Sequence, residues 1–236
     1  MPPVFIGTQS LLKRYIGNTE VTKVFIGVQE AYSSAMRLGM NLGWINSWAG
    51  AIPFSNVLYN MGLWSRVTGS GAYAQTKGLL TATVSTDTFR AKISDNGLGM
   101  PTGTYTVLNP DGAKIAIGDY STATLYNGWT TATSFTFSYS ATGLLAIWSE
   151  GSVTNSIGNL SIIIPGHLTS WNAGNVWNTD FINFHKNAKF SVLRMMDWGI
   201  ASSNIETYWS DRATATGISL YSPAAGGASV PYELMI

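Results

Sequence analysis

Two segments of the chain combine tryptophan with side chains that hydrogen-bond well to sugar hydroxyls. The first runs from Asn41 to Trp48, and the second from Arg194 to Trp198 with Trp209–Arg212 following. A tryptophan ring stacks on the apolar face of a sugar, while carboxylate, amide and guanidinium groups bond to its hydroxyls. These residues predict a carbohydrate-binding site built from Asn41, Trp44, Trp48, Arg194, Asp197, Trp198, Trp209 and Arg212. The alternative is a packing role, in which Asp197 pairs with Arg194 or Arg212 inside a core.

Other kinds of chemistry find little support in the residue types. Glycoside hydrolysis needs two acids that face one bond, and the 12 acidic residues show no such pair. The chain has no cysteine, which excludes disulfides and thiolate metal sites, and His167 and His185 lack metal-ligand spacing. We therefore expect no metal and no cofactor. We also expect no nucleic-acid binding, because a net charge of +1 without a basic block cannot neutralise a row of phosphates.

The composition is typical of a strand-rich protein that works outside a cell. The 236 residues are 45% hydrophobic, enough for a core, and only 11% are charged. The N-terminus lacks the basic and apolar regions of a signal peptide. The longest strongly apolar run, Leu160–Ile164, is too short to span a bilayer, so we expect no membrane insertion. An extracellular composition without an export signal favours a virus particle component, which leaves the cell by lysis.

Three copies of one three-residue motif stand at a ten-residue spacing near the N-terminus. They are Phe5-Ile6-Gly7, Tyr15-Ile16-Gly17 and Phe25-Ile26-Gly27. Ten residues make one strand and one turn, which cannot bury an apolar face without neighbours. The repeats therefore predict a β module that assembles with other chains, and a closed homotrimer is the expected arrangement. We expect the glycines Gly7, Gly17 and Gly27 at turn positions.

The middle of the chain predicts antiparallel β structure. Strands are expected at Thr104–Leu108, Lys114–Ile117, Ser134–Ser138, Leu144–Ser149 and Leu160–Ile164. The first two are joined by Asn109–Gly112, whose Pro and Asp-Gly predict a hairpin. Several short strands at this spacing indicate a β-sandwich.

Two stretches beside the strands predict helices. Val57, Leu58, Met61 and Trp64 lie at helical spacing, so a helix is expected to begin near Ser55 and to end before Gly69. A second helix is expected to begin near Thr179 or Asp180.

The C-terminal part predicts an α/β unit. A buried strand is expected at Phe190–Met196, after the helix near Thr179. Val230–Ile236 predicts the first turn of another helix, which suggests the front part of a longer protein. The predicted segments are residues 1–35 (a β repeat and attachment module), 36–72 (a linker strand and helix that pack with the C-terminal segment), 73–165 (a β-sandwich) and 166–236 (an incipient, truncated α/β segment).

A set of motifs in a shared order resembles a known group of proteins. They are Gly39–Trp48, Pro53-Phe54, Gly103–Leu108, Ile162–Gly166, Leu193–Trp198, Trp209–Arg212 and Val230–Glu233. The group comprises large phage and bacterial proteins with a β-sandwich ahead of a glycoside-hydrolase-like (β/α) barrel. The ten-residue Ile-Gly repeats resemble repeats in tail-fibre and tailspike proteins of tailed phages. The fold class expected is mainly β, with a short N-terminal β repeat module, an antiparallel sandwich and a C-terminal segment resembling the start of a (β/α) barrel.

The resemblance implies sugar binding or cleavage by a complete barrel. The strands that carry catalytic acids in such enzymes would lie beyond Ile236, so no catalytic residue is carried over to this chain. The function expected is a structural virion protein of a tailed phage, attached to other virion proteins through its N-terminal region and presenting a region that binds host-surface glycans. One alternative is the front part of a glycoside hydrolase that acts on surface polysaccharide. A second alternative is a capsid decoration protein.

Overall fold

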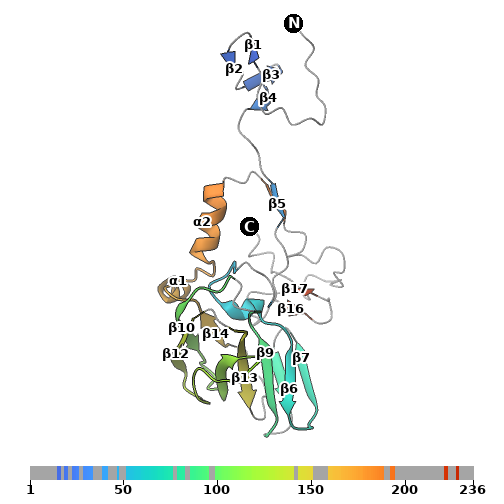
Figure 1. The fold of residues 1–236 in the computed structure, drawn as a ribbon, viewed down its shortest axis with the longest axis vertical. Helices are drawn as coiled ribbons and strands as arrows, with labels where there is room; N and C mark the ends of the chain where they lie inside the picture. The colour runs from blue at the N-terminus through green and yellow to red at the C-terminus, as the bar shows by residue number, and fades with distance from the viewer. Residues whose placement is uncertain are drawn as a thin grey trace.

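The structure is a computed structural model of the 236-residue chain. It describes residues 15–16, 19–20, 23–26, 29–33, 39–41, 47, 52–76, 79–82, 86–95, 99–140, 143–150, 159–188, 192–194, 221–222 and 227–228. Most of these residues belong to two antiparallel sheets and to the short helices beside them (Figure 1).

Two antiparallel sheets form the body of the fold. One has the strand order β12-β10-β14 and the other the order β11-β13-β9-β6. The strands are β6 Trp64–Thr68, β9 Thr88–Lys92, β10 Gly103–Leu108, β11 Ile115–Asp119, β12 Ser134–Tyr139, β13 Leu145–Glu150 and β14 Ser161–Ile163. One cluster of buried side chains draws members from both sheets, so the sheets pack face to face. The predicted antiparallel, mainly β fold is confirmed, and the arrangement is consistent with a β-sandwich.

Alternation of side chains builds this core. Phe89 and Ala91 of β9, and Tyr105 and Val107 of β10, are fully buried, while the residues between them are partly exposed. Strands β11 and β13 depart from alternation because both of their faces are covered. On the outer face a second cluster of Ala116, Ala146 and Trp148 is packed by Tyr120, Leu125 and Trp129.

The hairpin predicted across Asn109–Gly112 is wrong, although both strands are present. Strand β10 pairs with β12 and β14, whereas β11 pairs with β13, so the turn crosses from one sheet to the other. Asn109 holds this crossing, because its amide donates to the carbonyls of Ala113 (2.9 Å) and Ala132 (3.1 Å), and its Oδ1 accepts from the Ala113 N–H. The turn chemistry was identified correctly, and Gly112 has a positive φ of 65°. The choice of pairing partner depends on distant strands.

The helix predicted from Ser55 to Gly69 is wrong beyond its first turn. Only a 3-10 helix, η1 (Val57–Asn60), forms there, and Trp64–Thr68 is strand β6, paired with β9. The Gly62 N–H donates to the carbonyl of Lys92 at 2.8 Å, which brings the backbone to the end of β9. Helical spacing is a weak signal, and pairing along a whole strand overrides it.

The C-terminal elements agree with the predicted helix and strand. Helix α1 (Leu168–Asn172) precedes α2 (Thr179–Ala188), which begins where the sequence predicted. Strand β15 (Val192–Arg194) lies within the predicted stretch 190–196. It pairs in parallel with β5 (Gly39–Asn41).

The other elements are short antiparallel pairs. They are β1 (Tyr15–Ile16) with β2 (Thr19–Glu20), β3 (Lys23–Ile26) with β4 (Gln29–Ser33), β7 (Tyr73–Thr76) with β8 (Leu79–Ala82), and β16 (Tyr221–Ser222) with β17 (Gly227–Ala228). Gly7, Gly17, Gly27 and the predicted helix at Val230–Ile236 lie outside the described residues. Among the helices that the structure describes, none has the length and apolarity needed to cross a membrane.

Candidate functional site

The parallel pair β5–β15 brings two of the predicted sugar-binding residues to adjacent positions. Arg194 stands opposite Asn41 in the register, and each is the last residue of its strand. Parallel strands end at the same edge of a sheet, so the chain leaves Asn41 and Arg194 from one edge. Polar residues at the carboxyl ends of parallel strands are a common position for binding sites.

The remaining predicted site residues follow these two strands in sequence. Trp44 and Trp48 come three and seven residues after Asn41, and Asp197 and Trp198 come three and four residues after Arg194. These four residues, together with Trp209 and Arg212, lie outside the described residues. The backbone register therefore joins one residue from each of the two predicted segments.

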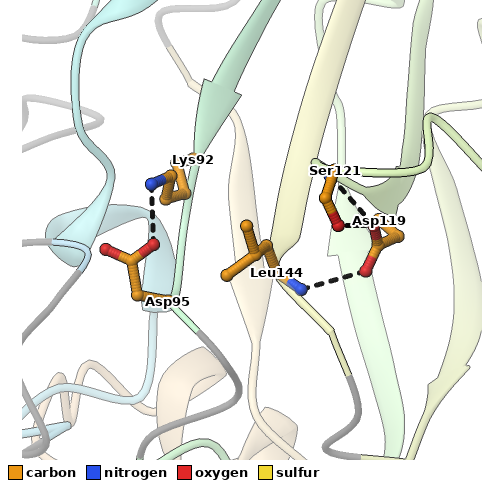
Figure 2. Close-up of polar contacts among 5 residues, drawn as sticks. All are labelled: Lys92, Asp95, Asp119, Ser121 and Leu144. Carbon is orange, nitrogen blue, oxygen red and sulfur yellow. Dashed lines mark hydrogen bonds and ion pairs between the residues drawn. The ribbon is translucent and has the colours of Figure 1, made fainter.

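Ser47, which belongs to the first predicted segment, is bonded to the residues that follow β9. The N–H of Asp95 donates to the Ser47 carbonyl at 2.6 Å, and Ser47 is buried. Asp95 lies three residues after the end of β9 and forms an ion pair with Lys92, the last residue of that strand, at 2.6 Å (Figure 2). In the sequence Ser47 stands between Trp44 and Trp48, and this contact places Ser47 itself beside the sandwich.

A second attachment joins residues 52–56 to the region around α1 and α2. The Ser55 N–H donates to the Val176 carbonyl at 2.8 Å, and the Asn178 N–H donates to the Pro53 carbonyl at 2.8 Å. The Asn178 side chain donates to the carbonyl of Ile52, also at 2.8 Å. The stretch that follows the first predicted segment is thus tied to the stretch that precedes the second.

Ser55 and His167 form a pair that resembles a nucleophile with its base, but the hydrogen bonds argue against this role. Ser55 Oγ lies 3.1 Å from His167 Nδ1 and 2.9 Å from the carbonyl oxygen of Trp177. A carbonyl only accepts, so the hydroxyl proton goes to Trp177, and His167 donates to Ser55. Ser55 is also fully buried. We assign this pair a structural role, because a nucleophile must reach substrate and pass its proton to the base.

An aromatic cluster lies beside this attachment. The Phe54 ring is 5.2 Å from Tyr59 and 5.0 Å from Trp177, and Trp177 stacks at 6.4 Å on Phe181 of α2 with an interplanar angle of 10°. Trp171 of α1 lies 6.5 Å from Tyr59. Trp171 and Trp177 are partly exposed. These two tryptophans were not among the predicted site residues, although Asn172 and Asn178 directly follow them in the chain.

Asp119 is an acid whose carboxylate is enclosed by hydrogen-bond donors. Its Oδ1 accepts from the N–H (2.9 Å) and hydroxyl (2.7 Å) of Ser121, and its Oδ2 accepts from the Leu144 N–H at 3.0 Å (Figure 2). Oδ1 also accepts from the N–H of Thr122 at 2.8 Å. These bonds, led by that of the Ser121 hydroxyl, lower the pKa of Asp119 to about 2. The group stays ionised at neutral pH and cannot act there as a general acid. It closes the turn after β11 and ties it to the start of β13.

No metal centre is found in the part of the chain that the structure describes, where no three histidines, aspartates or glutamates converge. Comparisons with protein-family models, with curated proteins and with solved structures found no match to this chain. The candidate site at the shared edge of β5 and β15 therefore rests on the residues of this chain alone.

Proposed function

We propose that this chain is a structural virion protein of a tailed phage, of the tail-fibre or tailspike type, and that it binds host-surface glycan. The observation that carries the glycan site is the register of β15 on β5, which sets Arg194 beside Asn41. Asn41 and Arg194 end their strands at one edge. Trp44 and Trp48 follow Asn41 in sequence, Asp197 and Trp198 follow Arg194, and Trp209 lies further along. Together these residue types have the composition of a sugar site.

In this proposal the N-terminal region attaches the chain to the particle. Residues 4–34 assemble with copies of themselves as a homotrimer and bind other virion proteins. The pairs β1–β2 and β3–β4 support this idea, because isolated two-stranded pairs are marginally stable and gain from neighbouring strands. The low share of charged residues suits a protein that works inside an assembly.

A second candidate is the front part of a glycoside hydrolase. The parallel pairing of β15 with β5 favours it, because parallel strands with a preceding helix are the unit from which (β/α) barrels are built. In this case a longer chain would supply further barrel strands and the catalytic acids. An acid at the carboxyl end of a later strand, together with release of reducing sugar, would favour this candidate.

The test of glycan binding uses the whole chain and two tryptophan variants. Trp198→Ala should abolish tryptophan quenching by the recognised polysaccharide in a panel of bacterial surface polysaccharides. We expect its affinity to fall at least about tenfold, or ~1.4 kcal/mol. Trp129→Ala is the matched control, because Trp129 packs on the outer face of the four-stranded sheet. Glycan binding that survives Trp198→Ala, or that Trp129→Ala also removes, would contradict the proposed site.

A further inference from the structure

The sandwich has four sheet edges, and β11 shows how completely one of them is closed. Its outward backbone groups bond to the segment 124–130: Ile115 exchanges both hydrogen bonds with Thr130 at 3.0 and 2.9 Å, and the Ile117 carbonyl accepts from the Tyr126 N–H at 2.8 Å. The Ile117 N–H donates to the side chain of Asn127 at 2.8 Å. An edge closed in this way cannot pair with another chain.

The edges at β6 and β14 are also closed by contacts with nearby residues. At β6, the amide of Gln75 accepts from the Trp64 N–H (2.7 Å) and donates to the Trp64 carbonyl (3.2 Å), as a neighbouring strand would. At β14, the Ile162 N–H donates to Asn56 Oδ1 at 3.0 Å, and the Ile164 N–H donates to the Ser55 carbonyl at 3.0 Å. Three of the four edges are thus protected by specific contacts.

The fourth edge, β12, lacks such protection within the described part of the chain. Thr133 points its carbonyl at β10, where it accepts from the Asn109 N–H at 2.8 Å. Because backbone groups alternate along a strand, the N–H and C=O groups of Ser134, Thr136 and Ser138 point away from β10. These three residues are exposed, and none of the described residues bonds to their outward groups. Strand β12 lies at the margin of the sandwich (Figure 1).

The residues of β12 carry none of the usual devices against edge pairing. Ser134–Tyr139 contains no charge and no proline, and its register with β10 runs without a bulge. Phe135 at this edge is only partly buried, whereas Phe137 is in the core. A further strand beside β12 would cover Phe135.

We propose that a second copy of this chain pairs antiparallel with β12 across a two-fold axis, joining the two three-stranded sheets into one. In an antiparallel pair of identical strands, the core-facing side chains of both strands lie on the same face of the sheet only if even-numbered residues stand opposite even-numbered ones. The two-fold axis then passes between the two copies of one residue. Centring on Thr136 places Thr136 opposite itself and Ser134 opposite Ser138, so all three outward residues find partners within the strand. Each such pair exchanges two hydrogen bonds.

The chemistry of the edge favours a second copy over a foreign peptide. Threonine opposite threonine and serine opposite serine are favourable cross-strand pairs, and Phe135 meets Phe137 of the other copy on the core side. With no charge on β12, the symmetric pair suffers no repulsion, and a charged peptide would find no counter-charge. This contact uses the sandwich alone, so it does not depend on residues 4–34 or on glycan binding.

Single cysteines test the register, since the chain has none of its own. In the proposed pair the two Cα atoms at position 136 lie about 5.5 Å apart, within disulfide range. Under mild oxidation Thr136→Cys should therefore form a covalent dimer at least about tenfold faster than Ser134→Cys, whose copies would stand about 14 Å apart. A mixture of Ser134→Cys and Ser138→Cys chains should cross-link to each other.

A charge substitution tests the association without a cross-link. Thr136→Lys places two lysines opposite each other and should reduce association through β12, measured in sedimentation velocity as the fraction of the higher-mass species, at least about tenfold relative to the unmodified chain. Thr104→Lys is the matched control, because Thr104 is exposed one strand inward, on β10. Equal cross-linking of Thr136→Cys and Ser134→Cys, or association that Thr136→Lys leaves unchanged, would overturn the proposal. Pairing of β12 with an unrelated strand, without pairing to a second copy of this chain, would also overturn the proposal.

Discussion

At the scale of single residues, the buried polar side chains of this chain join segments that are distant in sequence. Asn56 Oδ1 accepts from the N–H groups of both Leu58 and Ile162, and so connects η1 to β14. Asp119 connects the end of β11 to Leu144 in the same manner. A buried polar group is costly unless it is bonded, and these bonds fix where each segment lies.

Asp119→Asn is expected to lower stability by about 1–2 kcal/mol, because an amide cannot accept all the bonds that the carboxylate accepts. The effect should depend on pH. The pKa of Asp119 is lowered from 3.8 to about 2 in the folded chain, so its contribution is present above pH ~4 and is lost as pH falls toward 2. Urea unfolding of the unmodified chain and of Asp119→Asn between pH 2 and 7 measures the difference between their free energies of unfolding.

The exposed acid Asp111, which accepts from the Asn159 side chain, is the control for that experiment. Asp111→Asn should change stability by less than about 0.5 kcal/mol. If the free energies of unfolding of the unmodified chain and of Asp119→Asn differed by the same amount from pH 7 to pH 2, this would contradict the assigned role of the carboxylate.

At the scale of elements, the decisive feature is which strands pair. Strands β10 and β11 follow each other in sequence yet belong to different sheets, and the turn at Asn109 makes the crossing. Strand β6 begins in a stretch whose apolar residues have helical spacing, yet it pairs with β9 and completes the four-stranded sheet. In both places a partner that lies far along the chain determines the local structure.

Asn109→Ala is expected to destabilise the fold by about 3 kcal/mol. The substitution leaves the N–H and carbonyl of buried Ala113 without their side-chain partner, and an unsatisfied buried group costs about 1–3 kcal/mol. Urea unfolding monitored by circular dichroism measures the change. Asn172→Ala, at an exposed position on α1, should stay within about 0.5 kcal/mol of the unmodified chain. Similar stabilities for the two variants would show that Asn109 does not hold the crossing.

At the scale of the whole molecule, the sandwich is an insertion between two paired strands. Strand β5 precedes the sandwich and β15 follows it, and they pair in parallel with Arg194 opposite Asn41. The proposed glycan site therefore draws on both sides of the insertion. The proposed β12 contact lies on the sandwich, and proposed attachment belongs to the N-terminal repeats.

Gly17→Val is expected to impair assembly of the chain more than Thr19→Ala does. Ile16 pairs with Thr19, so two residues connect β1 to β2, and such short connections favour glycine at positive φ. A β-branched residue at positive φ costs about 1–2 kcal/mol in each copy. Light scattering on the purified variants measures the assembled mass. Equal assembly by Gly17→Val and Thr19→Ala would show that the turns do not limit the repeats.

The sequence alone was enough for features that depend on neighbours along the chain. The strand predicted at Ser134–Ser138 forms as β12, and the helix predicted to begin near Thr179 or Asp180 forms as α2. Turn chemistry identified the bend at Asn109–Gly112. Period and turn residues are local properties, so they can be read without knowing any distant contact.

Pairing between distant segments could be established only by the tertiary structure. Nothing near Asn41 in sequence indicates that its register partner is Arg194, and nothing near Trp64 indicates that β9 draws it into a strand. The apparent hairpin at Asn109 belongs to two sheets for the same reason. Hydrogen bonds and burial between strands far apart in the chain outweigh local preference, since propensity contributes only tenths of a kcal/mol per residue and packing contributes several.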